Sequence, residues 1–314
     1  KILVLINPPY AEAMNADNIS NNENAESKLG VSKTKVSALM DAQGYAAREL
    51  FVQFLVRIAK EIPTATLAMF SKLKYVNAPN FEKFRGDWNA AYLGGFIVHS
   101  RAFDGLKGEF PIGFLVWQTD QTAKAKTPIT EVMTEVLDKN ATPIGEKYFY
   151  NLANNKLLGD WIKRPKTNKV DVIPLKNAVT PASVNKDLRG TKWSDNAIAC
   201  MIFQGSDIQH SKTTAILSSG FGSAGSIFVN TENLWQAAVI FSVRRLIKPT
   251  WINDRDQFLQ PTEPLTDEFK NDCLIWMLFN GSNLTASAND LEWNGKKWSI
   301  INHFIPFKEE EVGS

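Results

Sequence analysis

The residues best suited to chemistry in this chain are Asn7, Pro8, Pro9 and Tyr10, which directly follow the apolar run from Ile2 to Ile6. Two consecutive prolines restrict the backbone and remove two N–H donors. The carbonyl oxygens of Asn7 and Pro8 are therefore free, fixed acceptors, and the side-chain oxygen of Asn7 is a third acceptor without charge. Tyr10 adds a flat ring for stacking. The tetrapeptide predicts a rigid site for a planar group that donates hydrogen bonds.

An exocyclic amine on an aromatic ring has the shape and the donors that these acceptors require. The Asn7 side-chain oxygen and the Pro8 carbonyl can accept its two N–H hydrogens, which turns the nitrogen lone pair out of the ring plane. Tyr10 can stack on the ring at the same time. Such an amine is a better nucleophile towards an electrophilic methyl group without losing a proton first, so catalysis would rest on orientation and electrostatics.

The elements that must position this tetrapeptide follow an α/β order. The run from Ile2 to Ile6 lacks alternation, which predicts a strand buried on both faces inside a parallel sheet. The carboxyl end of such a strand is where open α/β sheets bind ligands. Downstream, the patterns predict a helix at 46–63 that ends at Pro63, a strand at 65–76, a helix at 77–93, and strands at 96–100 and 112–120. The last two strands have a short connection, so we expect them to be antiparallel.

The sequence Asn-Pro-Pro-Tyr after an apolar strand resembles the catalytic motif of N6-adenine DNA methyltransferases. The segments up to residue 120 are also similar in order and spacing to those of DNA adenine methylases. Residues 121–314 resemble, more loosely, the target-recognition part of large restriction–modification methylases. The resemblance implies an α/β fold, in which residues 1–120 form half of a Rossmann-like methyltransferase mixed sheet and residues 121–314 form an α+β DNA target-recognition region. The polar stretch at 118–126 marks the expected boundary.

The resemblance also implies roles for individual residues. Residues 7–10 would be the catalytic residues of a site-specific DNA adenine-N6 methyltransferase, which methylates the exocyclic amine of an adenine flipped out of the duplex. Phe103, the aromatic residue after the third strand, matches the position that stacks on the base opposite Tyr10, and Phe110 is the second choice. Double-stranded DNA is the expected partner, with a restriction or specificity subunit or domain as a further one.

The resemblance implies S-adenosyl-L-methionine as the methyl donor. In the family, a glycine-rich turn after the first strand of the sheet and an acidic residue after the second strand bind it. With the usual order this motif is expected upstream of Lys1, so we expect a fragment with little methyl transfer by itself. The pattern G-x-G-x-x-G at 220–225 raises the alternative of a circular permutation. Residues 226–229 separate it from the next helix and no acidic residue precedes it, which favours a plain loop.

Local patches of basic and aromatic residues are the candidates for DNA contacts, because a net charge of +2 gives no overall signal for binding a polyanion. For each patch alone a solvated surface is the simpler interpretation, but as a set they fit a surface that follows a duplex. The predicted DNA-binding residues are Lys72, Lys74, Lys163, Arg164, Lys166 and Lys192, and the pair Arg244-Arg245 is a further patch of this kind.

The cysteines and histidines argue against disulfide and metal chemistry. Cys200 and Cys273 lie far apart in apolar runs, which predicts two buried thiols in a reducing compartment. The three histidines have no ligand at metal-binding spacing, so no metal site is expected. No apolar run reaches the ~18 residues of a membrane helix, and no signal peptide is recognisable. We expect a soluble, cytoplasmic protein with no membrane partner.

Two alternatives stay open. One is a methyltransferase that acts on an RNA base or on a protein glutamine amide. The long second region argues against it, because such enzymes need little after the catalytic strands. The other is a non-catalytic DNA-binding specificity module that retains a vestigial methylase half.

Overall fold

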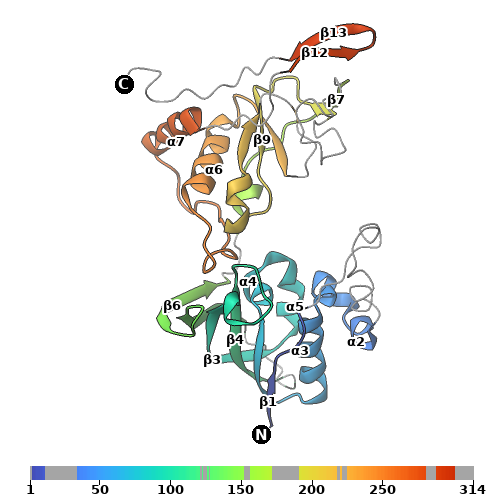
Figure 1. Ribbon diagram of the computed structural model, residues 1–314, viewed down its shortest axis with the longest axis vertical. Coiled ribbons are helices and arrows are strands. Elements are labelled where there is room, and N and C mark those ends of the chain that lie inside the picture. Colours follow the sequence, from blue (N-terminus) through green and yellow to red (C-terminus); the bar gives the residue numbers. More distant parts are fainter. Residues whose placement is uncertain are drawn as a thin grey trace. The chain divides into compact units, whose positions relative to one another are not determined.

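A computed structural model describes residues 2–10, 34–120, 122, 126, 128–151, 156–171, 191–217, 220, 225–280 and 288–300. The chain forms two compact units (Figure 1), each treated by itself below. Unit 1 comprises Lys1–Asn155 with Thr250–Arg255, and unit 2 comprises Lys156–Pro249 with Asp256–Ser314. Across the described ranges, no helix is both long and apolar enough to span a membrane.

Unit 1 is built around one mixed sheet of six strands. The strands are β1 (Leu3–Ile6), β2 (Thr66–Lys72), β3 (Ala90–His99), β4 (Pro111–Thr119), β5 (Glu131–Leu137) and β6 (Pro143–Tyr150). The helices are α2 (Lys35–Ala38), α3 (Leu50–Glu61), α4 (Lys74–Asn77) and α5 (Glu82–Asp87), with 3-10 turns at Asp41–Arg48, Pro79–Phe81 and Ser100–Ala102. The strand order is β1-β2-β4-β3-β5-β6. The pairs β1–β2 and β3–β5 are parallel and the other pairs are antiparallel, which confirms the mixed α/β fold class.

The apolar stripe of α3 explains how the sheet is covered on one face. The sequence predicted a stripe of Leu50, Phe51, Phe54, Leu55 and Ile58; of these Phe51 and Leu55 are buried, together with Ala59, whereas Phe54 is exposed. The three buried residues pack in one cluster with Leu67 of β2 and Leu115 of β4. The helix ends at Glu61, two residues before Pro63, because proline cannot continue an α-helix. Fully burying each large side chain of this type stabilises the fold by about 1.5–3 kcal/mol.

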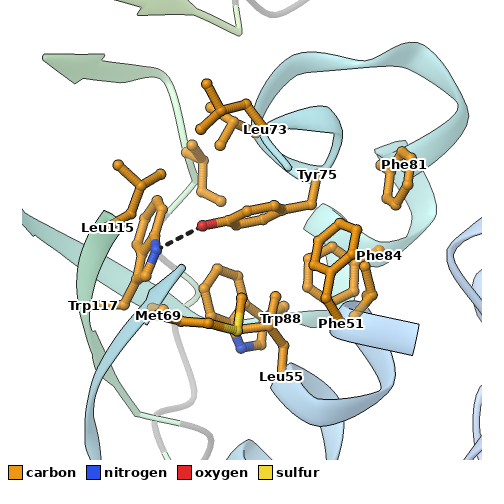
Figure 2. Packing of buried hydrophobic residues seen from close by; sticks show 14 of the residues in the cluster. Phe51, Leu55, Met69, Leu73, Tyr75, Phe81, Phe84, Trp88, Leu115 and Trp117 are labelled. Atoms are coloured by element: carbon orange, nitrogen blue, oxygen red, sulfur yellow. Dashed lines mark hydrogen bonds between the residues drawn. The ribbon is translucent and has the colours of Figure 1, made fainter. Parts of the chain in front are cut away.

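A hydrogen-bonded pair of aromatic residues lies at the centre of this core. The indole N–H of Trp117 donates to the Tyr75 hydroxyl at 3.0 Å, and both side chains are buried (Figure 2). The rings of Phe51, Phe84 and Trp88 surround Tyr75. The polar atoms of Trp117 and Tyr75 therefore satisfy each other where little water can reach them.

Changing Tyr75 to Phe is expected to lower the free energy of unfolding of unit 1 by about 1–3 kcal/mol, because it leaves the buried Trp117 N–H without its acceptor. The midpoint of denaturant unfolding would measure this loss. Tyr92→Phe is the matched control: the Tyr92 hydroxyl donates to the Met133 carbonyl, but its side chain is half-exposed, so water can replace that bond. Equal losses for the two variants would contradict a special role for the buried pair.

The prediction that the first strand is buried on both faces is wrong. In β1 the side chains of Val4 and Ile6 pack against the core, whereas Leu3 and Leu5 are each 68% exposed. Within the described residues, β2 is the one strand that pairs with β1. Helices α3, α4 and α5 contribute to the core on only one face of this sheet, and no described helix covers Leu3 and Leu5 on the other.

The predicted elements between residues 65 and 100 also need correction. The second strand ends at Lys72, and its last predicted residues form α4 instead. The third strand begins at Ala90, six residues earlier than expected, because α5 already ends at Asp87. Gly95 allows the backbones of the paired strands β3 and β4 to approach closely, since a Cβ atom there would lie 2.3 Å from the Phe114 carbonyl oxygen. The antiparallel pairing of β3 with β4 is confirmed.

The compact unit extends beyond the boundary expected at 118–126. Strand β5 pairs in parallel with β3, and β6 pairs with β5, so both belong to the first sheet. The side chains of Val132, Val136 and Phe149 enter the same core as α3. The division at residue 155 therefore follows the sheet rather than the polar stretch.

Unit 2 combines short antiparallel strands with two packed helices, as expected of an α+β region. The strands are β7 (Asn168–Lys169), β8 (Lys192–Trp193), β9 (Ala199–Ile202), β10 (Ala215–Leu217), β11 (Ser226–Val229), β12 (Ala288–Trp293) and β13 (Lys296–Ile300). The helices are α6 (Leu234–Leu246) and α7 (Asp267–Asn280), with 3-10 turns at Leu158–Asp160 and Ile208–Thr213. Strands β10, β9 and β11 form one sheet, whose Met201 packs in one core with Phe241 of α6 and Met277 of α7. Helix α6 is the helix that the sequence predicted after residues 226–229.

Candidate functional site

The topology of unit 1 brings three segments to one edge of its sheet. Strands β1 and β2 are parallel, and β3 runs in the same direction because β4 lies antiparallel to both β2 and β3. The carboxyl ends of β1, β2 and β3 therefore point to the same edge. Residues 7–10 follow β1, Lys72 ends β2, and Phe103 follows β3. This is the edge at which the sequence predicted a ligand site.

The tetrapeptide combines exposed acceptors with a partly buried ring. Asn7 is exposed, Pro8 is buried and Tyr10 is half-buried. The Tyr10 hydroxyl donates a hydrogen bond to Asn7 Oδ1 at 3.0 Å. Burial raises the pKa of the Tyr10 phenol to about 12, so the hydroxyl stays protonated at neutral pH and remains a donor. This bond orients the Asn7 amide so that its oxygen, rather than its nitrogen, faces Tyr10.

Because a carboxamide oxygen has two lone pairs, Asn7 Oδ1 can accept from Tyr10 and from a second donor at once. The Pro8 carbonyl follows it in the chain, on a backbone that the prolines restrict. The arrangement can hold a planar amine and stack one face of its ring, without any charged group acting as acid or base.

The aromatic residue after β3 packs on a second aromatic residue that the sequence analysis did not single out. The rings of Phe103 and Phe70 lie 5.4 Å apart in an edge-to-face arrangement. Phe70 also contacts Phe96 and Phe114, so four half-buried rings from β2, β3, β4 and the β3–β4 connection form one cluster. Strand alternation places Phe70 on the same face as Lys72, which is the signal that could have found it.

Phe110 is held by the loop that closes the β3–β4 hairpin. The Ser100 backbone N–H donates to the Phe110 carbonyl at 3.0 Å, and the buried Ser100 hydroxyl donates to the Gly108 carbonyl. No ring contact joins Tyr10 to Phe103 or Phe110 among the described aromatic pairs. The sheet thus brings both phenylalanines to the edge where Tyr10 lies, and base stacking by either one stays a prediction.

No family model and no curated protein matches this chain. Solved structures that are similar to part of it include two DNA complexes. One is an ATP-dependent Type ISP restriction-modification enzyme, LlaBIII, bound to DNA, with 10% identity and a TM-score of 0.28 over 65% of this chain and 14% of that one. The other is a DrdV–DNA complex, with 12% identity and a TM-score of 0.29 over 65% of this chain and 22% of that one. This chain thus spans less than a quarter of either protein, and likenesses this low assign it no activity.

Two of the predicted DNA-binding lysines lie in unit 1 and already have partners there. The Lys72 ammonium donates to the Tyr10 carbonyl oxygen at 3.4 Å. The Lys74 ammonium lies 2.6 Å from the carboxylate of Glu49, which is fully buried. A phosphate at Lys74 would have to compete with this buried carboxylate for the ammonium group. The structure thus gives Lys74 a structural role that the sequence did not reveal.

The other four predicted DNA-binding residues, Lys163, Arg164, Lys166 and Lys192, are exposed in unit 2. Arg164 donates to the Ser226 carbonyl at the start of β11, and Lys163 lies 3.5 Å from Glu232, just beyond that strand. Trp193, next to Lys192, packs its ring on Phe228 of β11. Lys192 also pairs across two strands with Lys169. Arg164 and Trp193, from segments far apart in sequence, therefore both contact β11, and exposed lysines lie beside each of them in the chain.

The structure excludes Arg244 from the basic surface. Its side chain is only 1% exposed and its guanidinium bonds to the chain itself, so it cannot reach a phosphate. Arg245, its neighbour, is exposed. The glycine-rich stretch at 220–225 lies mostly outside the described residues, and its cofactor role stays untested.

The cysteines match the prediction of buried thiols: Cys200 and Cys273 are both buried and neither forms a disulfide. Among the described residues, no three His, Cys, Asp or Glu side chains lie where they could hold a metal ion.

Proposed function

We propose that this chain carries the catalytic residues of an S-adenosylmethionine-dependent, adenine-N6 DNA methyltransferase of restriction–modification type. The observation that supports it most is the tetrapeptide at the carboxyl edge of a parallel strand pair, with an oriented Asn7 oxygen, the adjacent Pro8 carbonyl and a half-buried Tyr10 ring. Residues 7–10 are the catalytic group in this proposal, and Phe103 is the stacking partner. The exposed basic residues around β11 are its DNA contacts.

The chain's own residues would act by holding the amine. Asn7 Oδ1 and the Pro8 carbonyl accept the two N–H bonds of the adenine amine, so the nitrogen lone pair points out of the ring plane. Tyr10 stacks on the flipped base and keeps water from one of its faces. As the nitrogen gains its new bond it becomes positively charged, and both acceptors then bind its hydrogens more strongly. The methylated amine afterwards gives one proton to solvent water and returns to neutrality.

The methyl donor supplies an electrophilic methyl group when it is bound. Across the described ranges, no glycine-rich turn follows a strand that pairs with β1. The described residues therefore form no recognisable binding site for the methyl donor. We therefore derive no step through the donor from this chain.

Methyl transfer by the protein expressed from its intact gene tests the proposal. The protein is incubated with mixed-sequence double-stranded DNA and a methyl-labelled donor, and the DNA is digested to nucleosides. We expect the label in N6-methyldeoxyadenosine, as identified by mass spectrometry. Mapping the modified adenines would then show whether one sequence is preferred.

The same assay separates the alternatives. Label in a methylated cytosine, in RNA or in a protein glutamine would replace the adenine assignment by another methyltransferase activity. Specific DNA binding without incorporation of label, from a protein that also binds the donor, would favour a non-catalytic specificity module. Either result would overturn the proposal.

Changing Tyr10 to Phe is expected to lower methyl transfer by about 2- to 10-fold, because it keeps the stacking ring but removes the hydroxyl that orients Asn7. Changing Tyr10 to Ala removes the ring as well, and we expect a further loss of about 1–3 kcal/mol in binding the flipped base. Single-turnover rates, together with the fluorescence of 2-aminopurine at the target position, would separate these two effects. A Tyr10→Phe loss as large as that of Tyr10→Ala would show that stacking contributes little.

A further inference from the structure

The tetrapeptide lacks the usual means of attachment to the neighbouring strand. The β1–β2 pairing ends with Ile6 opposite Met69, but β2 continues for three more residues, to Lys72. If the parallel pairing continued past Ile6, backbone N–H groups of residues 7–10 would have to donate to carbonyls of β2. Pro8 and Pro9 have no such groups. The segment that must hold two acceptors in place is therefore deprived of the bonds that fix ordinary strand residues.

A side chain at the end of β2 spans this gap. Lys72 is half-buried, and its ammonium donates to the carbonyl oxygen of Tyr10 at 3.4 Å. This bond attaches the far end of the tetrapeptide, while the β1–β2 ladder holds the near end at Ile6. A charged donor strengthens such a bond relative to a neutral one. Between the two anchors the chain has little freedom, because both prolines restrict its backbone.

We propose that Lys72 is a positioning residue, which holds residues 7–10 in the geometry that binds the amine by anchoring the Tyr10 carbonyl. This inference rests on the proposed function for its effect on catalysis, but the anchor itself does not. The role differs from the phosphate contact that the sequence predicted for Lys72. A phosphate contact acts on DNA affinity and its salt dependence, whereas an anchor acts on the order of the tetrapeptide and on the rate of the chemical step.

The test uses Lys72→Met in the protein expressed from its intact gene, because methionine keeps the length and apolar stem of lysine but cannot donate. Hydrogen exchange of the backbone N–H groups in residues 2–10 measures how well the tetrapeptide is ordered, and it does not require activity. The kcat for methylation, the KM for DNA and the slope of log affinity against log salt measure the effects on catalysis and on DNA binding. Lys83→Met, at an exposed position on α5, is the matched control, and Lys72→Arg restores a charged donor.

We expect Lys72→Met to speed exchange of the Asn7 and Tyr10 amides several-fold and to lower kcat by about 10- to 100-fold. The KM for DNA, the salt slope and the unfolding midpoint should stay at their wild-type values. Lys72→Arg should recover most of kcat, and Lys83→Met should change nothing.

Two results would overturn the inference. Unchanged exchange at residues 2–10 in Lys72→Met would show that the bond to Tyr10 does not order the tetrapeptide. Weaker DNA binding with a salt slope reduced by about 0.9, at unchanged kcat, would identify Lys72 as a phosphate contact instead. If exchange accelerates but the wild-type protein methylates no adenine, the anchor stands and the proposed function fails.

Discussion

Replacing Asn7 by Ala in the protein expressed from its intact gene is expected to slow adenine methylation by about 100- to 1,000-fold and to leave DNA affinity unchanged. The substitution removes one of the two acceptors of the amine and also the partner of the Tyr10 hydroxyl. Since Asn7 is exposed at the end of β1 and contributes nothing to the core, the fold should not change. Single-turnover methylation and equilibrium DNA binding, measured at one salt concentration, would show the split.

The expected size of this effect follows from the stage of the reaction at which the hydrogen bond from the adenine amine to Asn7 Oδ1 becomes stronger. An acceptor that gains strength as the nitrogen becomes charged stabilises the transition state more than the bound adenine, so its loss appears in kcat rather than in binding. Asn7→Asp keeps acceptor oxygens at the same place, and we expect it to retain more activity than Asn7→Ala. Asn80→Ala is the control for replacing an exposed asparagine by alanine, because Asn80 is exposed in the turn Pro79–Phe81. Methylation within about threefold of wild type in Asn7→Ala would contradict the mechanism.

Local patterns predicted the parts of the fold that depend on local forces. The helix α3 and its end before Pro63 could be predicted from sequence, because apolar spacing and the effect of a proline both depend on residues within one or two helical turns. The short β3–β4 connection predicted antiparallel pairing because it leaves no room for a crossover helix. The length of β3 could not be predicted, since its residues before 96 adopt strand conformation only because they pair with β4.

The limits of the candidate site have the same physical origin. The acceptors of residues 7–10 could be predicted because proline chemistry is local. The partners of Lys72 and Lys74 could not, because Tyr10 lies 62 residues away and Glu49 25 residues away along the chain. Both lysines looked like free surface charges in sequence. Phe103 follows β3, but its packing on Phe70 depends on a strand pairing that no local pattern specifies.

The buried guanidinium of Arg244 predicts the largest loss of stability in unit 2. Its Nε donates to Thr214 Oγ1 at 2.8 Å, and its two terminal nitrogens donate to the carbonyls of Gly205 and Gln204, each at 2.9 Å. It also lies over the rings of Phe203 and Phe258. Burial lowers the pKa of Arg244 to about 10, which leaves the group charged at neutral pH. The side chain joins α6 to the loop after β9 and contacts the ring of Phe258, which lies between α6 and α7 in the chain.

Replacing Arg244 by Met is expected to lower the free energy of unfolding of unit 2 by about 3–5 kcal/mol, because it removes the buried donor to Thr214 Oγ1 and the donors to the part-buried carbonyls of Gly205 and Gln204. Lysine at this position keeps the charge but cannot reach acceptors in three directions, so Arg244→Lys should recover only part of the loss. Arg245→Met is the control: this neighbour is exposed, with one long bond of 3.4 Å to the Thr214 carbonyl and its guanidinium over the Phe241 ring, so its removal should cost no more than about 1 kcal/mol.

Denaturant unfolding distinguishes this role from a general loss of fold. Because the chain forms two compact units, each should show its own transition, and only that of unit 2 should move in Arg244→Met. Equal costs for Arg244→Met and Arg245→Met would mean that water replaces the guanidinium in its pocket. A shift confined to unit 2, and larger for Arg244→Met than for Arg244→Lys, would support the role of the guanidinium. It would show that one buried cation on α6 orders residues 204–214, which connect β9 to β10.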